Sequence, residues 1–250
     1  MGSLPPLGVA LRSHVPAVVA WVAGTAGVGA VFGVFTDDIT EVVAANPALA
    51  DAMGSGAADD AAGHYVSYVL VLLVLMAIGC AAQGIGRVRA EETTGRLESV
   101  LATRVSRPRW LAVQASLVVL GACVVALVGG AALAAVADGS TGVDAGAVAR
   151  AGAAYLPAVL VVGALGLLLV GQAPRATSLV WGAVGYVAFV ELLGATLSLP
   201  EWAMALSPLH AVGRLPTEPA DGTAVAVLVA LAAVLAAVGV VGFRRRDVPR

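Results

Sequence analysis

Six long apolar runs divide the chain. Each has at least 20 residues, and they span residues 16–36, 64–86, 110–137, 153–172, 177–197 and 222–243. An α-helix of about 20 residues crosses a hydrocarbon core about 30 Å thick. None of the runs alternates apolar and polar positions as membrane β-strands do, and all are longer than such strands. The pattern predicts an all-α integral membrane protein with six transmembrane helices.

Composition agrees with the pattern. The chain is 60% hydrophobic and only 12% charged, whereas about a quarter of the residues in a soluble domain are charged. The first run has no basic segment before it and no small-residue cleavage site after it, so we expect it to be retained as a helix rather than removed as a signal peptide. Cys80 and Cys123 fall inside apolar runs and are interpreted as small packing residues.

The arginines indicate the orientation, because cytoplasmic loops carry an excess of basic residues. With a cytoplasmic N-terminus, 12 of the 14 Arg lie inside and 11 of the 16 acidic residues lie outside. We therefore expect both termini to be cytoplasmic. The chain contains no lysine and is rich in Ala, Val, Gly and Arg, which suggests a GC-rich genome. We expect a multi-pass protein of the inner (plasma) membrane of a bacterium with such a genome.

A charge-dense segment, residues 87–109, separates the second run from the third. It holds six Arg and three Glu, and placing nine charges in the bilayer would cost about 2.5–3.5 kcal/mol each, so the segment must face water. Leu97, Val100, Leu101 and Val105 recur with helical spacing and predict a short amphipathic helix. We expect a cytoplasmic loop that carries this helix between helices 2 and 3.

Two interpretations of this loop remain. Its arginines could simply follow the positive-inside rule, with the short helix lying on the inner leaflet. The three Glu favour the alternative, because anionic lipid repels carboxylates, whereas mixed charges and an apolar face suit a protein partner.

The loop also carries a recognisable motif. Residues 91–98 read EETTGRLE, followed by Leu101-Ala102-Thr103, and this stretch resembles the cytoplasmic coupling segment of ABC-2 type transporter permeases. The resemblance is greatest to the second half of actinobacterial permeases described as polyketide-antibiotic exporters. It implies docking to a cytosolic ABC ATPase through Glu91, Glu92, Gly95, Arg96, Leu97, Glu98 and Leu101. It also implies a single permease domain, residues 1–250, that pairs with an identical or different second half or belongs to a longer chain.

The chain is not expected to bind nucleotide itself. A P-loop needs a lysine that reaches the phosphates, and the chain has none, so we expect ATP and magnesium to be bound by the partner ATPase. His14, His64 and His210 are isolated in the sequence, and the Ser207 and His210 pair has no third member. We therefore expect no catalytic residues, no metal site and no cofactor in this chain, and no nucleic-acid partner.

Glu191 is the one acidic residue inside an apolar run. A membrane-embedded ionisable group suggests a functional site, so Glu191 is a candidate for the substrate path. It could equally make a structural polar contact near the outer surface. Gln83, Gln114 and Gln172 lie near cytoplasmic helix ends, where we expect water to satisfy them.

Small residues and external segments complete the prediction. Gly29 and Gly33 in the first helix, and Gly182 and Gly185 in the fifth, permit close packing within the chain or across a dimer interface. Residues 198–221 contain Trp202 and four prolines and predict a segment that lies in, or re-enters, the outer membrane interface. In the resembled family an interfacial elbow precedes the first helix, and residues 1–14 are its counterpart.

The functional hypothesis is a transmembrane permease subunit of an ABC-2 type exporter, acting among membrane lipids on an amphipathic small molecule or lipid. The first alternative is a proton-coupled secondary transporter that uses Glu191. The second is a membrane scaffold that docks a cytosolic protein.

Overall fold

The computed structural model describes residues 6–46, 61–93, 107–137 and 144–245, and all regular elements in these ranges are helical. In chain order they are α1 (Pro6–Val34), α2 (Thr36–Ala45), α4 (Ala61–Thr93), α6 (Arg107–Ala137), α7 (Ala145–Ala154), α8 (Leu156–Gln172), η1 (Pro174–Ala176), α9 (Leu179–Leu193), α10 (Glu201–Ala205), η2 (His210–Val212) and α11 (Gly222–Arg245). The all-α prediction is therefore confirmed for the described residues.

Within the described ranges, five helical segments are long and apolar enough to cross a membrane: α1, α4, α6, the α7–α8 pair and α11. The fifth predicted run forms α9, which has only 15 residues. At 1.5 Å per residue this is about 22 Å, less than a full hydrocarbon core. The helix ends at Gly194, and Pro200 follows in extended backbone. The structure thus gives five full-length candidate spans, and a sixth crossing through α9 stays a prediction.

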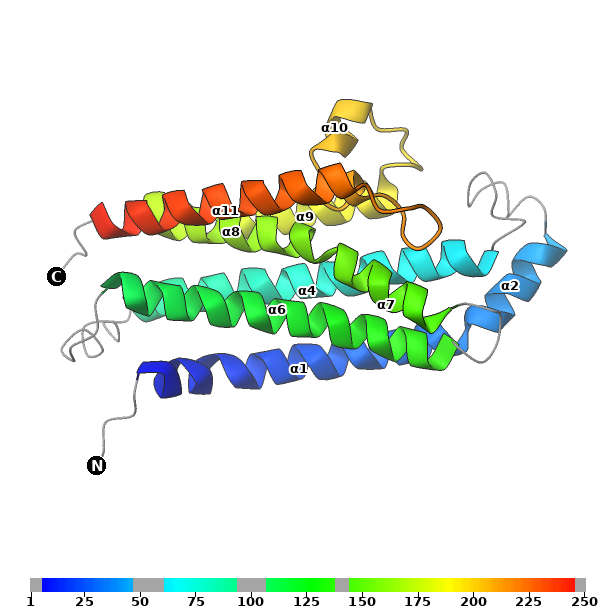
Figure 1. The fold of residues 1–250 in the computed structure, drawn as a ribbon, viewed down its shortest axis with the longest axis horizontal. Coiled ribbons are helices and arrows are strands. Elements are labelled where there is room, and N and C mark those ends of the chain that lie inside the picture. The colour runs from blue at the N-terminus through cyan, green and yellow to red at the C-terminus, as the bar shows by residue number, and fades with distance from the viewer. Residues whose placement is uncertain (1–5, 47–60, 94–106, 138–143, 246–250) are drawn as a thin grey trace.

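The long helices lie side by side in one elongated bundle (Figure 1). The start of α1 and the end of α11 lie at the same end of the bundle, on the left of Figure 1, together with the end of α4 and the start of α6. Helix α2 and the start of α7 lie at the opposite end. We call these the loop end and the α2 end.

Helix α4 forms the centre of the bundle. Its most apolar stretch is 67% buried, whereas the corresponding stretches of α1 and α11 are 17% buried. The outer helices expose apolar side chains such as Val19 and Val31 on α1 and Val227 and Val234 on α11. A stable protein exposes such continuous apolar surface where lipid rather than water covers it. The protein is a multi-pass membrane protein.

Glycines set the closest helix crossings. A Cβ on Gly29 of α1 would lie 2.6 Å from the carbonyl oxygen of Gly129 on α6, and one on Gly33 would lie 2.9 Å from Cβ of Val136. In the other half of the bundle, a Cβ on Gly171 of α8 would lie 2.0 Å from the carbonyl oxygen of Gly239 on α11. Close backbone approach of this kind drives helix association in lipid. The α1–α6 and α8–α11 pairs are therefore closed by small residues within this chain.

The two glycines of α9 differ from those of α1. A Cβ added to Gly182 or to Gly185 would meet nothing within 4 Å, so neither glycine is at a close crossing within the described part of the chain. Leu179 and Trp181 beside them are 63% and 48% exposed. This part of α9 faces away from the other described helices.

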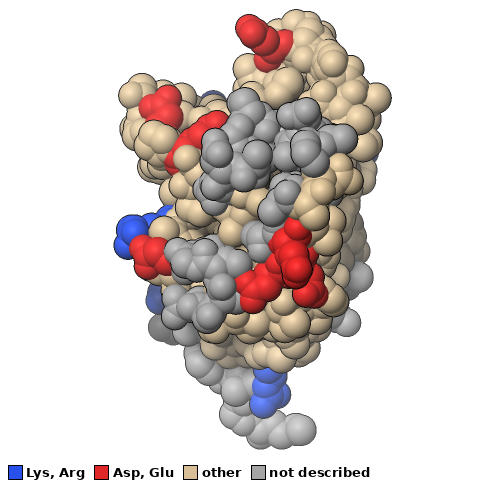
Figure 2. Space-filling model, turned by 90° about the vertical axis from the view of Figure 1, so that its right-hand side faces the viewer, with Lys and Arg blue, Asp and Glu red and all other residues tan. Residues whose placement is uncertain are grey.

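Acidic residues predominate at the α2 end of the bundle and basic residues at the loop end. Figure 2 looks onto the α2 end, where Asp and Glu gather and Arg is sparse. Asp37 and Asp38 lie in the first turn of α2, and Asp144 caps α7. At the loop end, Arg87 and Arg89 lie near the end of α4, and Arg109 near the start of α6. The side of the membrane that each end faces stays a prediction.

Asp144 fixes where the chain enters α7. Its carboxylate accepts hydrogen bonds from the backbone N–H groups of Gly146 and Ala147 at 2.9 and 3.1 Å. The Gly146 N–H, assisted by the Arg150 guanidinium, lowers the pKa of Asp144 below its ordinary value. The carboxylate therefore stays ionised at neutral pH and caps the exposed helix N-terminus.

Two glycines of α8 provide a matched test of the α8–α11 crossing. Gly171→Ala places a methyl group against the Gly239 backbone, whereas Gly163→Ala places one where nothing lies within 4 Å. Overpacking costs about 1–3 kcal/mol, whereas replacing Gly by Ala in an open helix position favours the helix by up to about 1 kcal/mol. We expect a lower thermal unfolding temperature in detergent for Gly171→Ala, and an unchanged or higher one for Gly163→Ala. Equal unfolding temperatures for the two variants would contradict the crossing.

Candidate functional site

The predicted ATPase-docking segment begins at the loop end of α4. Glu91 and Glu92 lie in the last turn of this helix. The other five predicted docking residues, Gly95, Arg96, Leu97, Glu98 and Leu101, lie outside the described residues, and so does the predicted amphipathic helix. What the structure describes is how the two helices that flank the segment are held.

A buried glutamine joins those two helices. Gln114 of α6 is 1% exposed, and its Nε2 donates a hydrogen bond to the carboxylate of Glu91 on α4. Its Oε1 lies 2.8 Å from Nε2 of His14 on α1. An amide oxygen only accepts hydrogen bonds, so His14 is the donor and carries a proton on Nε2. We call His14, Gln114 and Glu91 the polar triad.

The polar triad connects three helices at one level of the bundle. It joins α1, α4 and α6 within two turns of the point where α4 ends and α6 begins. Because Gln114 is buried, separating any of these helices would leave polar groups unpaired, at a cost of about 1–3 kcal/mol for each group. The two helices that flank the charged segment are thus coupled to each other and to α1.

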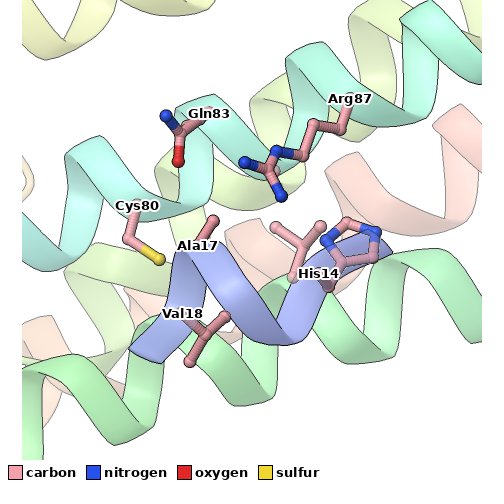
Figure 3. Close-up of a pocket in the computed structure, with 8 residues that line it drawn as sticks. His14, Ala17, Val18, Cys80, Gln83 and Arg87 are labelled. Carbon is pink, nitrogen blue, oxygen red and sulfur yellow. The ribbon is translucent and has the colours of Figure 1, made fainter. Parts of the chain in front are cut away.

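Helices α1 and α4 make a second set of polar contacts beside the triad. The Arg87 guanidinium donates to the backbone carbonyl of Ser13 at 2.5 Å, and the Trp21 indole N–H donates to Oε1 of Gln83 at 2.9 Å. Pro16 lies between these contacts and has no N–H to donate, which weakens the local helical hydrogen bonding of α1. Figure 3 shows Gln83 and Arg87 reaching from α4 towards α1, with His14 close by.

Glu91 and Glu92 have different surroundings. The side chain of Glu92 is 3% exposed, and its Oε2 lies 2.7 Å from Nη1 of Arg89, one turn earlier on α4. Glu91 is half-buried and is held by Gln114. A partner that contacted Glu92 directly would have to separate the Arg89 pair.

The sequence alone did not reveal the polar triad. Of the three glutamines expected to be satisfied by water, only Gln172 is exposed, and its Nε2 donates to the carbonyl of Val238. For Gln114 the expectation is wrong, because its side chain is sealed between three helices. Its partner His14 is 100 residues away in the chain, so no spacing pattern within one helix could have paired them.

Glu191 lies near the opposite end of the bundle and binds the segment that was predicted to be external, residues 198–221. The hydroxyl of Ser207 donates to its Oε1 at 2.6 Å, and Ser207 is fully buried. The backbone N–H of His210 in turn donates to the Ser207 hydroxyl at 3.4 Å. In this structure Glu191 therefore makes an inter-segment polar contact, and whether it also lines a substrate path stays a prediction.

Two tyrosines hold the same segment, residues 198–221. The hydroxyl of Tyr155 is shared by two backbone groups, because it donates to the carbonyl of Gly213 at 2.8 Å and accepts from the N–H of Leu215 at 3.0 Å. The hydroxyl of Tyr186 on α9 donates to the carbonyl of Ala203 in α10 at 2.7 Å. These contacts attach residues 203–215 to the start of α8 and to the middle of α9, while Trp202 remains 74% exposed.

The histidines and cysteines form no metal centre within the described ranges. No group of three His, Cys, Asp or Glu side chains in these ranges has the arrangement needed to hold a metal ion. His14, His64 and His210 lie on α1, α4 and η2, and the two cysteines are free thiols.

Comparison with known proteins places this architecture in a family. The family described as "Multidrug efflux system permease Rv1217c, C-terminal domain" matches residues 5–244, almost the whole chain. The chain belongs to this family. The resemblance to ABC-2 type permeases is supported at the level of the permease family, and the narrower similarity to polyketide-antibiotic exporters stays a prediction.

A curated relative gives the same result. The chain is 33% identical over 254 aligned residues to the multidrug efflux system permease protein Rv1217c of Mycobacterium tuberculosis (strain ATCC 25618 / H37Rv). The match covers 97% of this chain but only 45% of the relative. The chain thus spans about half the length of the curated protein that it matches.

The polar triad can be tested through stability. Gln114→Leu removes both hydrogen bonds and leaves His14 and Glu91 without their shared partner, so we expect unfolding to become easier by about 1–3 kcal/mol. Gln172→Leu is the control, because Gln172 is exposed and loses a single hydrogen bond, to the carbonyl of Val238, so its loss should cost less than that of the buried Gln114. Chemical denaturation of the purified protein in mild detergent measures both changes. Equal losses for the two variants would argue against a buried connection.

The tyrosine contacts can be tested through local protection. Tyr155→Phe removes both hydrogen bonds to residues 213 and 215, so we expect faster backbone amide exchange there without global unfolding. Tyr68→Phe is the control, because Tyr68 is 49% exposed on α4. Hydrogen–deuterium exchange read by mass spectrometry makes the comparison, and unchanged exchange near Gly213 in Tyr155→Phe would rule out the anchoring role.

Proposed function

We propose that this chain is a permease domain of an ATP-driven ABC-2 type exporter that moves amphipathic small molecules or lipids out of a bacterial plasma membrane. The observation that carries the proposal is the match over nearly the whole chain to one domain of a multidrug efflux permease. The long apolar helices and the segregated charge agree with it.

The energy source is a separate subunit. Without any lysine, the chain cannot supply the P-loop residue that contacts nucleotide phosphates. ATP and magnesium therefore belong to a cytosolic ABC ATPase, which docks on residues 87–109. In this arrangement both termini and the loop end of the bundle face the cytoplasm, in agreement with the excess of arginine there.

In this proposal the polar triad transmits movement of the docked ATPase to the membrane helices. Movement of the charged segment acts on its two flanking helices, α4 and α6. Because Gln114 binds both Glu91 and His14, that movement passes to α1 as well, and the three helices tilt together. A path for the substrate then opens beside or between the two halves of the transporter.

A second permease half completes the transporter. The chain matches a C-terminal domain and spans 45% of its relative, so a further half of similar size is needed, whether in the same protein or in another chain. The exposed surface of α9 around Gly182 and Gly185 is open in this chain and is a candidate contact for that half. Gly29 and Gly33 of α1 are already packed against α6 within this chain.

A proton-coupled transporter is the second candidate, because Glu191 is a half-buried carboxylate on an apolar helix. Its Ser207 contact favours a structural role, and Glu191→Gln preserves an acceptor for that hydroxyl. Under the exporter proposal, transport by Glu191→Gln remains ATP-dependent and close to the parent rate. Under proton coupling it loses most of its activity and its pH dependence.

Copurification tests the docking. When the protein is extracted gently from its native membrane, we expect a P-loop ATPase to accompany it. Arg96→Glu reverses a charge within the docking segment and should reduce ATPase recovery by about tenfold, since charge complementarity across an interface contributes on the order of 1–2 kcal/mol. Arg175→Glu reverses an exposed charge at the same end of the bundle, outside the segment, and should not change recovery.

Two results would contradict the proposal. One is the absence of any P-loop ATPase in the parent preparation. The other is an equal loss of ATPase recovery in Arg96→Glu and Arg175→Glu. Recovery would then depend on the total positive charge at the loop end and not on the docking segment. A recovered ATPase without ATP-dependent transport in reconstituted vesicles would favour the scaffold alternative.

A further inference from the structure

A groove between α1 and α4 opens on the outside of the bundle near its loop end. Its volume is about 460 Å³, within the range of roughly 300–1,000 Å³ that is typical of small-molecule sites. Pro16, Ala20, Trp21 and Gly24 line it from α1, and Gln83 and Arg87 line it from α4. The polar triad lies on the other side of these residues, against α6, and does not use the groove.

On α1 the groove is lined by a stripe of small side chains, and a positive charge lies at one end of the stripe. Pro16, Ala20 and Gly24 are spaced four residues apart, and Arg12 occupies the preceding position of the same series. Successive members of such a series are neighbours on the helix surface, and all four are exposed; Pro16, Ala20 and Gly24 line the groove, and Arg12 lies one turn beyond them. The stripe is about 18 Å long at 1.5 Å per residue, slightly more than one leaflet of a hydrocarbon core about 30 Å thick.

Trp21 closes the inner side of the groove. Its indole N–H is already bonded to Gln83, and its ring packs over Gly79 of α4, where an added Cβ would lie 3.2 Å from the ring. The polar edge of the indole is therefore satisfied and the remaining ring surface is apolar. Together with the small side chains of the stripe, it makes a surface suited to a hydrocarbon chain.

Arg87 supplies positive charge at the loop end of the groove. It is half-buried, and one of its nitrogens donates to the Ser13 carbonyl. No carboxylate within the described part of the chain lies within 4.0 Å of it: the ion pairs formed there are Arg89–Glu92 and Arg150–Asp144. Glu91, one turn further along α4, is held by Gln114 on the α6 side. A guanidinium has five N–H donors, so Arg87 retains donors for an anion.

From this arrangement we propose that the groove binds one anionic phospholipid of the leaflet at the loop end. The lipid phosphate lies between Arg87 and Arg12, and one acyl chain lies along the α1 stripe as far as Gly24. Charge complementarity selects this lipid over a zwitterionic one, because both side chains at the headgroup level are cationic. The site requires only that the bundle lies in a membrane. The lipid proposal therefore does not depend on whether an ATPase docks.

Native mass spectrometry of the full chain tests the headgroup. The protein is equilibrated in mixed micelles with equal amounts of phosphatidylglycerol and phosphatidylethanolamine of the same acyl length, and retained lipids are counted. We expect the parent protein to retain one phosphatidylglycerol preferentially. Arg87→Gln should weaken that preference by about fivefold, the size expected for one basic residue facing anionic lipid. Arg109→Gln removes an exposed arginine of α6 at the same end of the bundle and should leave it unchanged.

A second pair of variants tests the acyl chain. Gly24→Leu fills the groove, and a Cβ at this position meets only Cε of Met76 at 3.9 Å, so the fold should tolerate it. Gly27→Leu adds the same side chain to α1 three residues later, where nothing lies within 4 Å. We expect Gly24→Leu to lose the bound phospholipid and Gly27→Leu to keep it, with equal thermal unfolding temperatures confirming that both variants fold.

The proposal is overturned if phosphatidylethanolamine is retained as well as phosphatidylglycerol, or if the retained species is not a phospholipid. It is also overturned if Arg109→Gln weakens the preference as much as Arg87→Gln, because the effect would then reflect general surface charge. Equal retention of phosphatidylglycerol by Gly24→Leu and by the parent protein would show that the groove is not the lipid site.

Discussion

The hydrogen bond from the Gln114 amide to the Glu91 carboxylate is the contact on which the proposed mechanism depends. It joins the last turn of α4 to α6 on either side of the charged segment, and the bond between His14 and Gln114 adds α1. A buried polar contact of this kind makes the packing specific, because its groups lose their partners when the helices shift. In the proposed mechanism the three helices respond as a unit to a force on the segment, and the Arg87–Ser13 and Trp21–Gln83 contacts between α1 and α4 add to the triad.

Close helix crossings provide the rigid background for that unit. The Gly29 and Gly129 backbones bring α1 and α6 together, and Gly171 and Gly239 do the same for α8 and α11. Lipid provides no hydrophobic force between helices, so packing of this kind and a few polar contacts hold the bundle together. Tyr155 and Glu191 secure residues 203–215 towards the other end. Among the described residues the two ends thus differ, one being mainly acidic and the other mainly basic.

The helices were the most predictable part of the fold, because runs of apolar residues determine which segments enter a membrane. The α9 span was overestimated, because the apolar run continues to Leu197 whereas the regular helix ends at Leu193. The docking motif could be recognised only by resemblance, and five of its residues lie outside the described ranges. Gln114 was missed, because a glutamine near a helix end is ordinarily solvated and its partners lie on distant segments. The lipid groove likewise depends on two helices whose facing residues no local pattern aligns.

The most direct test compares ATP hydrolysis with transport after the permease is reconstituted with the ATPase that is proposed to dock on residues 87–109. If Gln114 carries motion from the charged segment to the membrane helices, Gln114→Leu should leave ATP hydrolysis near the parent rate while substrate transport per ATP falls by about tenfold, equivalent to about 1.4 kcal/mol of lost coupling. Parent-level transport per ATP in a correctly folded Gln114→Leu complex would contradict the account.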